Sequence, residues 1–242
     1  LGGNGNDQLN GGSGADSMLG GAGDDFYNVD DPLDRVVEAA NGGTDRVNAT
    51  VSHTLAPDVE NLTLGGSGAI AGTGNTLANA MVGNAGANLL SGLDGNDVLQ
   101  GGGGADTLLG GNGNDNLSGQ DGADLLVGGA GFDVLAGGAG ADSFRFGAPI
   151  GDWDRITDFA AGVDRIEVVG ADFGNLLPPG ALAAAAFREG AFAVGSDAQF
   201  LYDTGTGVLR WDEDGAGGGK SVIVAVLTGA PSLQAGDIWV VS

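Results

Sequence analysis

An aspartate recurs every nine residues through the middle of the chain, each time after a glycine-rich stretch. Between residues 92 and 145 each unit begins with glycine, carries aspartate at its sixth position and has a large apolar residue at its eighth. Calcium takes six to eight oxygen ligands, mainly from carboxylates and backbone carbonyls. A regular row of carboxylates beside glycine-rich turns would suit such an ion, so Asp97, Asp106, Asp115, Asp124, Asp133 and Asp142 are candidate cation ligands.

Each unit must supply a turn and a short strand to position its aspartate. The glycine-rich part can turn sharply, because glycine tolerates positive φ at little steric cost. The remaining three residues form a strand whose eighth position points away from its seventh and ninth. One strand cannot bury a single apolar side chain alone, so pairs of units should form coils that stack. The expected interior column is Leu99, Leu108, Leu117, Leu126, Leu135 and Phe144.

Units that stand eighteen residues apart lie above one another in such a stack. The second repeat region therefore has two columns of aspartates, one with Asp97, Asp115 and Asp133 and the other with Asp106, Asp124 and Asp142. Without cations, carboxylates would face one another at about 5 Å, the spacing of neighbouring strands. We expect folding to require metal, because ion binding would remove this repulsion.

Three more units occupy residues 2–28, with sixth-position aspartates at Asp7, Asp16 and Asp25. Asp7 and Asp25 share a column, which predicts at least one ion between their turns. The repeat pattern ends soon afterwards, so the sequence does not identify what stacks on Asp16.

The nonapeptide Gly-Gly-x-Gly-x-Asp-x-U-x, where U is a large apolar residue, resembles the calcium-binding repeat of the RTX (repeats-in-toxin) family. The resemblance implies an all-β fold, a right-handed parallel β-roll with a β-rich C-terminal cap. It also implies that each ion lies between stacked turns, bound by their sixth-position aspartates and by carbonyls of positions one to four. About five to eight calcium ions are expected. The carbonyls would come from Gly101, Gly102, Gly103, Gly104, Gly110, Gly111, Asn112, Gly113, Gly119, Gln120, Asp121, Gly122, Gly128 and Ala130.

Four regions are expected along the chain. Residues 1–28 form the first repeat block. Residues 29–64 alternate as strands do and should form a spacer of wider coils without metal, with strands over 35–38, 45–48, 50–55 and 59–64. Residues 65–145 form the second repeat block and keep the period of nine. In its first three units, however, the sixth position holds Ile70, Asn79 and Asn88 instead of aspartate. Calcium binding is therefore expected only from about residue 92.

Residues 146–242 resemble the C-terminal region of RTX proteins exported by type I secretion. They should contain a short helix over 181–187, a hairpin from 199–203 and 208–212, and a buried strand over 221–227. Asp158 or Asp164 is a candidate ligand for an ion at the end of the roll. The alternative is that these residues lie in a solvated turn. The tail from Asp237 to Ser242 resembles an uncleaved export signal, and a plain terminal strand is the alternative.

The composition favours cations as partners. The chain has 32 acidic and 8 basic residues and a net charge of −24, which disfavours nucleic acid and anionic membranes. It has no cysteine and no apolar run long enough to enter a membrane as a span. The single histidine, His53, is expected on a strand facing solvent. Leu1 has the character of the end of a preceding unit, so we expect a longer protein.

Three functions remain open from the sequence. The first is a secreted module, extracellular or at the cell surface, that passes through a type I secretion apparatus and folds on meeting calcium. The second is a surface-layer, adhesin or filament component that associates with itself through calcium. The third is the C-terminal part of a secreted protease, lipase or epimerase with its catalytic domain upstream. No HExxH or GxSxG motif is present, so we expect no catalysis from this chain itself.

Overall fold

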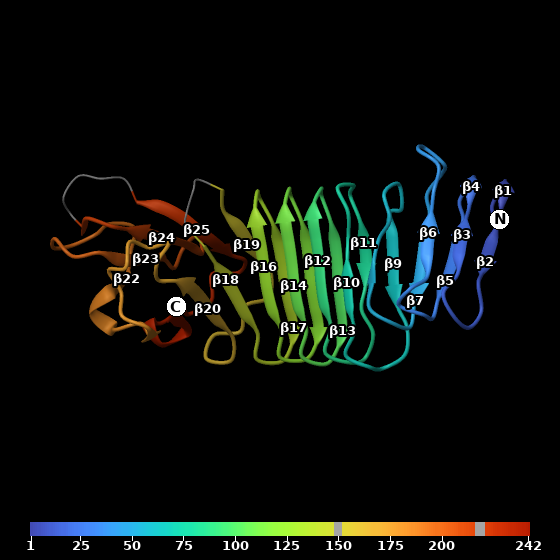
Figure 1. Ribbon diagram of the computed structural model, residues 1–242. Helices are drawn as coiled ribbons and strands as arrows, with labels where there is room; N and C mark the ends of the chain where they lie inside the picture. The colour runs from blue at the N-terminus through green and yellow to red at the C-terminus, as the bar shows by residue number, and fades with distance from the viewer. Residues whose placement is uncertain (148–151, 216–220) are drawn as a thin grey trace.

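The computed structural model describes residues 1–147, 152–215 and 221–242. The chain winds into an elongated solenoid whose coils follow one another from the N-terminal end to a C-terminal cap (Figure 1). Through the repeats every paired strand runs parallel to its neighbour. The expectation of an all-β parallel roll with a β-rich cap is confirmed.

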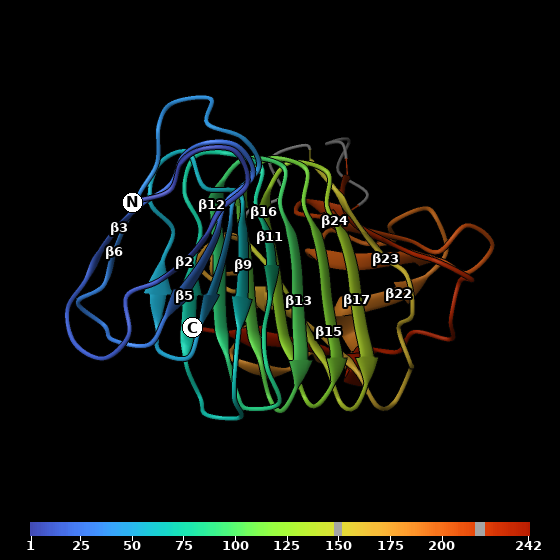
Figure 2. The ribbon, with the colours of Figure 1, turned by 90° about the vertical axis from the view of Figure 1, so that its right-hand side faces the viewer.

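Two large sheets form the two faces of the solenoid, as the view along its axis shows (Figure 2). In spatial order the first sheet contains β2 (Gln8–Asn10), β5 (Phe26–Val29), β7 (Arg46–Ala49), β9 (Asn61–Leu64), β11 (Ala80–Val82), β13 (Val98–Gly103), β15 (Asn116–Asp121), β17 (Val134–Ala139), β19 (Asp154–Ile156), β25 (Val222–Leu227), β24 (Val208–Asp212), β23 (Gln199–Asp203) and β22 (Phe187–Glu189). The second contains β21 (Gly180–Ala181), β26 (Ile238–Val241), β20 (Arg165–Val169), β18 (Ser143–Phe146), β16 (Leu125–Ala130), β14 (Thr107–Asn112), β12 (Leu89–Asp94), β10 (Ala71–Thr73) and β8 (His53–Thr54). Two short pairs complete the N-terminal coils, β1 (Gly3–Asn4) with β4 (Gly21–Ala22) and β3 (Ser17–Leu19) with β6 (Arg35–Val37).

The core is a single apolar column between the two sheets. Leu99, Leu117 and Leu135 lie in register on one face and are fully buried. The predicted residues of the other face, Leu108, Leu126 and Phe144, are equally buried and in register. The prediction that the eighth residue of each nonapeptide points to the interior is therefore confirmed for these six residues of the second repeat block.

One coil of the roll lacks an apolar side chain at the interior position. Gly72 occupies this position in β10, in register with Leu90 of β12. The ends of the Leu62, Met81 and Leu90 side chains lie where a Cβ of Gly72 would point. Long neighbouring side chains thus fill the space and keep the core continuous.

The strands of the second block are twice as long as predicted. β12 to β17 have six residues each, because pairing continues through the first three positions of the following unit. Gly102 pairs with Gln120 and Gly103 with Asp121, for example. The turn is therefore confined to the middle of each nonapeptide.

Glycine is required at the second and fourth positions by the turn geometry. Gly111 and Gly113 have φ angles of +119° and +130°, which side chains disfavour. A Cβ at either residue would also collide with a backbone carbonyl of the preceding coil, that of Leu93 or Gly95. Leu93 itself keeps a positive φ of +82° without being glycine.

Three of the four spacer strands are confirmed, as β6, β7 and β9. The fourth prediction, a strand over 50–55, is wrong in length, since only the two residues of β8 pair. His53 on this strand is half-buried, and its Nε2 atom is buried without a hydrogen-bond partner. It does not face solvent as expected, and burial lowers the pKa of its imidazole.

The cap contains the predicted hairpin, since β23 and β24 pair antiparallel. β25 follows over most of the predicted range, partly buried, and joins the hairpin to β19 of the roll. The predicted helix over 181–187 is wrong. Only a 3-10 turn, η1 (Ala184–Ala186), forms there, because residues on both sides are drawn into β21 and β22. A second 3-10 turn, η3 (Ala235–Asp237), precedes the terminal strand β26.

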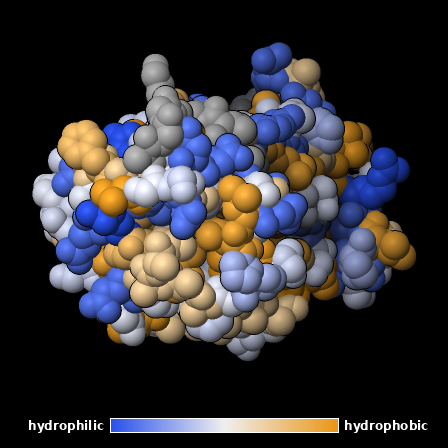
Figure 3. All heavy atoms as spheres, turned by 90° about the vertical axis from the view of Figure 1, so that its left-hand side faces the viewer, coloured by the Kyte–Doolittle hydropathy of each residue, from blue (hydrophilic) through white to orange (hydrophobic). Residues whose placement is uncertain are grey.

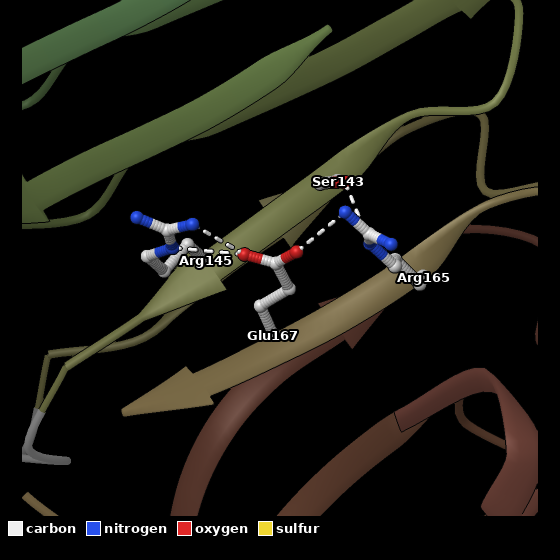
Figure 4. A network of polar contacts seen from close by, with 4 residues as sticks. All are labelled: Ser143, Arg145, Arg165 and Glu167. Atoms are coloured by element: carbon white, nitrogen blue, oxygen red, sulfur yellow. Dashed lines mark hydrogen bonds and ion pairs between the residues drawn. The ribbon is translucent and has the colours of Figure 1, made fainter. Parts of the chain in front are cut away.

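A buried glutamate joins the roll to the cap. Glu167 of β20 accepts ion-pair contacts from Arg145 of β18 at 2.7 Å and from Arg165 at 2.8 Å (Figure 4). Arg165 also donates from Nε to the Ser143 hydroxyl and lies over the Trp239 ring of β26. These are the ion pairs found within the described ranges, and both lie outside the aspartate columns.

The cap end of the molecule carries patches of apolar atoms between polar ones (Figure 3). Exposed large apolar residues of the cap include Leu176, Phe192 and Val194. No helix in the described part of the chain has the length and hydropathy needed to cross a membrane.

Candidate metal centres

The sixth-position aspartates form two continuous hydrogen-bonded ladders along the roll. In each ladder, Oδ1 of an aspartate accepts a hydrogen bond from the backbone N–H of the sixth-position residue one coil earlier. The N–H of Asp97 donates to Asp115 at 2.7 Å, and that of Asp115 donates to Asp133 at 2.7 Å. The other ladder repeats the contact from Asp106 through Asp124 to Asp142. The two predicted columns are therefore real, and one carboxylate oxygen of each rung is already used.

The second oxygen of each carboxylate has no partner. Oδ2 is buried and unpaired in Asp7, Asp25, Asp45, Asp97, Asp106, Asp115, Asp124, Asp133 and Asp142. A buried oxygen that bears charge and lacks a hydrogen bond is costly, so proteins pair such atoms or bind a cation to them. This free oxygen is the feature of the ladders that could bind a metal.

Apart from that of Asp45, each free oxygen lies beside a first-position glycine, where a larger residue would not fit. A methyl group on Gly110 would collide with Oδ2 of Asp115 and with the carbonyl oxygen of Gly128, one coil further along. A carboxylate oxygen and a carbonyl oxygen thus approach the same point from two coils and form a small cradle there. The same combination recurs at the first-position residues Gly2, Gly92, Gly101 and Gly119. The chemistry of this donor set suits a hard cation such as calcium.

The turn carbonyls point alternately to the coil before and the coil after. The first-position carbonyl of Gly128 faces the cradle of Gly110, whereas the fourth-position carbonyl of Gly113 faces Gly131 of the next coil. The third-position carbonyl of Ala130 accepts a hydrogen bond from the N–H of Gly113 at 2.8 Å. Of the predicted carbonyl donors, those of Gly110, Gly119 and Gly128 therefore lie beside a free carboxylate oxygen, whereas that of Gly101 lies beside Oδ1 of Asn88.

Two asparagines show what happens where the sixth position is uncharged. Oδ1 of Asn88 accepts a hydrogen bond from the N–H of Asn84 at 2.7 Å, and its amide group donates to the carbonyl of Ile70 at 3.0 Å. Both polar groups of the Asn79 side chain are likewise paired: its Oδ1 accepts from the N–H of Asn75, and its amide group donates to the carbonyl of Val59. The side-chain oxygen of Asn88 is therefore already used by its own turn. In residues 65–91 the sixth-position amides are therefore paired with backbone groups of their own and neighbouring turns.

The ladders continue into the spacer through residues that sequence reasoning missed. Asp34 accepts from the N–H of Asp16 at 3.0 Å, which supplies the partner that the repeat pattern could not name. Asp45 accepts from Asp25 at 2.7 Å, and Glu60 accepts from Asp45 at 2.8 Å. Asp34 stands eighteen residues after Asp16, so the spacing alone could have identified it.

The ladders end in the cap on three aspartates. Asp154 accepts from the N–H of Asp133, and Asp164 accepts from Asp142, both at 3.0 Å. Asp164 also accepts from Ala160 at 2.7 Å, so both its oxygens are used. Asp158 accepts from the N–H groups of two consecutive glycines of the last turn. Asp158 and Asp164 thus cap the roll by hydrogen bonds.

Burial and mutual repulsion disfavour the charged form of the column residues. Burial, followed by the charges of Asp133 and Asp97, raises the pKa of Asp115 to about 6. Burial likewise raises the pKa of Asp142 to about 6. No arginine or lysine forms an ion pair with these carboxylates in the described ranges. The columns therefore carry negative charge that a bound cation would compensate.

Comparison with known proteins supports this chemistry. A family model described as RTX calcium-binding nonapeptide repeat (4 copies) matches residues 1–31, 82–117 and 118–148. Curated proteins give no match. Among solved structures, the chain is similar to the solution structure of the AlgE6R3 subunit from the Azotobacter vinelandii mannuronan C5-epimerase, with 30% identity over 59% of this chain and 77% of that chain. The TM-score of that pair is 0.37, too low to support an argument on function. The matched ranges contain both aspartate ladders of the repeat blocks, and the chain thus carries the RTX calcium-binding nonapeptide repeat.

Proposed function

We propose that this chain is a calcium-dependent folding module that is secreted and folds on meeting calcium outside the cell. In this proposal each ion lies in a glycine cradle between two coils. It is bound by the free Oδ2 of a sixth-position aspartate and by the first-position carbonyl of the next coil, with further oxygens from the turns. One ion in each of the described cradles gives about five, at the lower end of the expected range.

The observation that carries the proposal is the contrast between aspartate and asparagine rungs. Asn88 fills its own turn with hydrogen bonds, whereas Asp106, one coil later, leaves a buried oxygen unpaired. Both side chains have nearly the same shape, and the backbone N–H of each donates to the sixth-position aspartate one coil later. The difference is a negative charge without a partner, and a cation bound in the cradle would supply the missing positive charge.

Folding should depend on calcium because the apolar column is narrow. From residue 92 to 145 each nonapeptide buries one large apolar side chain, and each also brings a carboxylate into the stack. The negative charges oppose stacking until ions bind, so ion binding contributes directly to the free energy of folding. Weak sites, with Kd near 10⁻⁴–10⁻³ M, suit extracellular calcium and would leave the chain unfolded at low calcium.

Export by a type I apparatus belongs to the same proposal. The net charge of −24 and the calcium requirement would keep the chain extended before secretion. The acidic and apolar tail, including Asp237 and Trp239, is the proposed export signal. In the folded protein the same tail forms β26, parallel to β20. The secretion apparatus would therefore have to recognise the tail before the chain folds.

Circular dichroism and calorimetry test the folding switch. The chain in chelator should have little β-structure, and calcium should restore it with heat from several bound ions. Asp115→Asn should lower the number of bound ions and raise the calcium concentration at the midpoint. Asp172→Asn, at an exposed site in the cap, is the matched control and should change neither. A chain with full β-structure in chelator, and no heat on adding calcium, would refute the proposal.

A further inference from the structure

Three carboxylates converge at the border between the first repeat block and the spacer. Oxygens of Asp25, Glu38 and Asp45 lie within 4.8 Å of one another. Asp25 is 2% exposed and Asp45 is fully buried. The Oδ2 atoms of both aspartates are buried without a partner, so the residues of the cluster contribute two unpaired charged oxygens. The cluster lies partly in the spacer, which the sequence alone assigns no metal.

Glu38 occupies the place at which the repeats present a backbone carbonyl. It stands eighteen residues after Gly20, as Gly20 stands eighteen after Gly2. A methyl on Gly2 would meet the carboxylate of Asp7 and the carbonyl of Gly20, whereas a methyl on Gly20 would meet Asp25 Oδ2, the Tyr27 hydroxyl and Glu38 Oε1. The cradle is thus conserved in shape, but a charged oxygen replaces a neutral one.

The surrounding contacts hold Glu38 in this position. Its Oε2 accepts hydrogen bonds from the N–H groups of Gly21 and Ala39, both at 3.1 Å. Its Oε1 accepts a hydrogen bond from the Tyr27 hydroxyl. The side chain is therefore fixed over the cradle, and the second lone pair of Oε1 remains available.

Asp45 completes the cluster because the ladder is kept across a longer coil. It stands twenty residues after Asp25, two more than in the repeats, yet its Oδ1 still accepts the N–H of Asp25 at 2.7 Å. The two extra residues lie in the loop between β6 and β7. Its Oδ2 is buried without a partner, as in the repeat rungs.

We propose that Asp25, Glu38 and Asp45 bind a divalent cation of the calcium class at a site outside the nonapeptide pattern. Three carboxylates around one divalent ion leave a charge of −1, whereas a repeat cradle offers one free carboxylate oxygen and a neutral carbonyl. Affinity for calcium rises with the charge of the ligand set and with the rigidity of the site. The spacer site should therefore fill at a lower calcium concentration than the repeat sites.

Electrostatics agree with an uncompensated cluster. Burial, and then the charges of Glu38 and Glu60, raise the pKa of Asp45 to about 6. The ion pairs found in the described part of the chain lie far along the solenoid, at Arg145 and Arg165. A cation is the missing partner for these charges.

Tyr27 makes the site observable in the full chain. Terbium is a spectroscopic substitute for calcium, and a bound terbium ion emits when a nearby excited aromatic ring transfers energy to it. The chain has only two tyrosines, and the Tyr202 hydroxyl is bonded to the carbonyl of Pro231 in the cap. The difference in terbium emission between the unchanged chain and Tyr27→Phe therefore reports the spacer site. Emission excited through the tryptophans is present in both and cancels in this difference.

Terbium added to the full chain should give Tyr27-dependent emission at low occupancy, and calcium should displace it. Glu38→Gln should weaken this component by about tenfold or more, because one charged ligand is lost. Asp24→Asn, at an exposed neighbour of the site, is the matched control and should leave the component unchanged. Asp115→Asn should also leave it unchanged, since that residue lies in the second block.

The outcomes separate this site from the repeat sites. Emission that does not depend on Tyr27, or that is unaltered by Glu38→Gln, overturns the spacer site even if calcium still folds the repeats. Because Glu38→Gln could disturb the coil, calcium-induced β-structure is measured in parallel. If that signal is retained and calorimetry counts one ion fewer than in the Asp24→Asn control, the lost ion is assigned to the spacer. If neither the number of bound ions nor the affinity of the tightest one changes, the proposal is contradicted.

Discussion

The backbone N–H of Asp133 donates to Oδ1 of Asp154 at 3.0 Å, although the two residues stand 21 positions apart instead of eighteen. The ladder therefore passes from the last repeats into the cap across a longer connection. Burial and the charge of Asp133 raise the pKa of Asp154 well above its usual range. This column ends in two close carboxylates, which are costly to ionise together without a cation.

The calcium-free chain should be more stable at about pH 5 than at about pH 7.5. An unfolded aspartate titrates near pH 3.9, whereas Asp115 and Asp142 in the folded chain titrate at about 6. Between these values the folded state binds more protons than the unfolded state. Stability is therefore gained as pH falls through this window and lost as pH rises through about 6.

Far-UV circular dichroism and thermal melting of the metal-free chain at the two pH values measure this effect. With saturating calcium the order should reverse, because protons compete with the ions for the same oxygens. Asp115→Asn removes one titrating group and should reduce the pH dependence of the metal-free chain. Equal or lower β-structure at about pH 5 without metal would contradict the pKa directions.

The first-position glycines of the repeats should not tolerate alanine. Gly110→Ala places a methyl against Oδ2 of Asp115 and the carbonyl of Gly128. We expect a loss of about 1–3 kcal/mol in calcium, by overpacking, together with weaker calcium binding. Urea unfolding in saturating calcium and calorimetry measure the two effects.

Gly103→Ala is the matched control for this substitution. A Cβ on Gly103 would have only an ordinary contact, at 3.7 Å from Cα of Ala85, and its φ lies outside the positive range. The later repeats carry alanine at the same third position, as at Ala130 and Ala139. The change in stability should stay within about 0.5 kcal/mol. Equal losses in the two variants would show that the cradle is not the cause.

The repeat period predicted most of the roll, because it fixes both the interior side chains and the stacking of the aspartates. Leu117 and Asp115 lie where the spacing of nine and eighteen places them. The period could not predict that Oδ1 of each aspartate is used by the neighbouring backbone, since a hydrogen bond between coils has no sequence signal of its own.

The spacer was harder to predict because its coils change length. Asp45 is twenty residues after Asp25, so a search at a fixed spacing misses it. Glu38 contributes a side chain where the repeats contribute a backbone atom, and only the folded coil shows this exchange. The short helix expected near residue 184 failed for another reason, because alanine propensity is weak against strand pairing on both sides.

Truncation of the interior column should cost far more than truncation on the outer face. Leu117 is fully buried between two coils, so Leu117→Ala should lower the free energy of unfolding by about 2–5 kcal/mol. Leu89→Ala is the control, since Leu89 is 45% exposed on β12, and its cost should stay below about 1 kcal/mol. Urea unfolding in calcium measures both. Similar costs for the two leucines would contradict the assignment of the interior face.

The Glu167 network should show strong coupling between its two arginines. Glu167 is 3% exposed, whereas the side chains of Arg145 and Arg165 are 37% and 48% exposed. Either arginine alone can pair with the carboxylate, so Arg145→Met should cost about 1 kcal/mol or less. Arg165→Met should cost somewhat more, because it also loses the contact with Trp239.

The double variant leaves Glu167 buried without a positive partner. Its cost should exceed the sum of the single costs and reach about 3 kcal/mol, because an uncompensated buried charge remains. A double-mutant cycle by urea unfolding in calcium measures the coupling. Adding Glu167→Gln to the double variant should recover part of the loss, since the amide carries no charge. Additive single costs, or no recovery, would show that the network does not join the roll to the cap energetically.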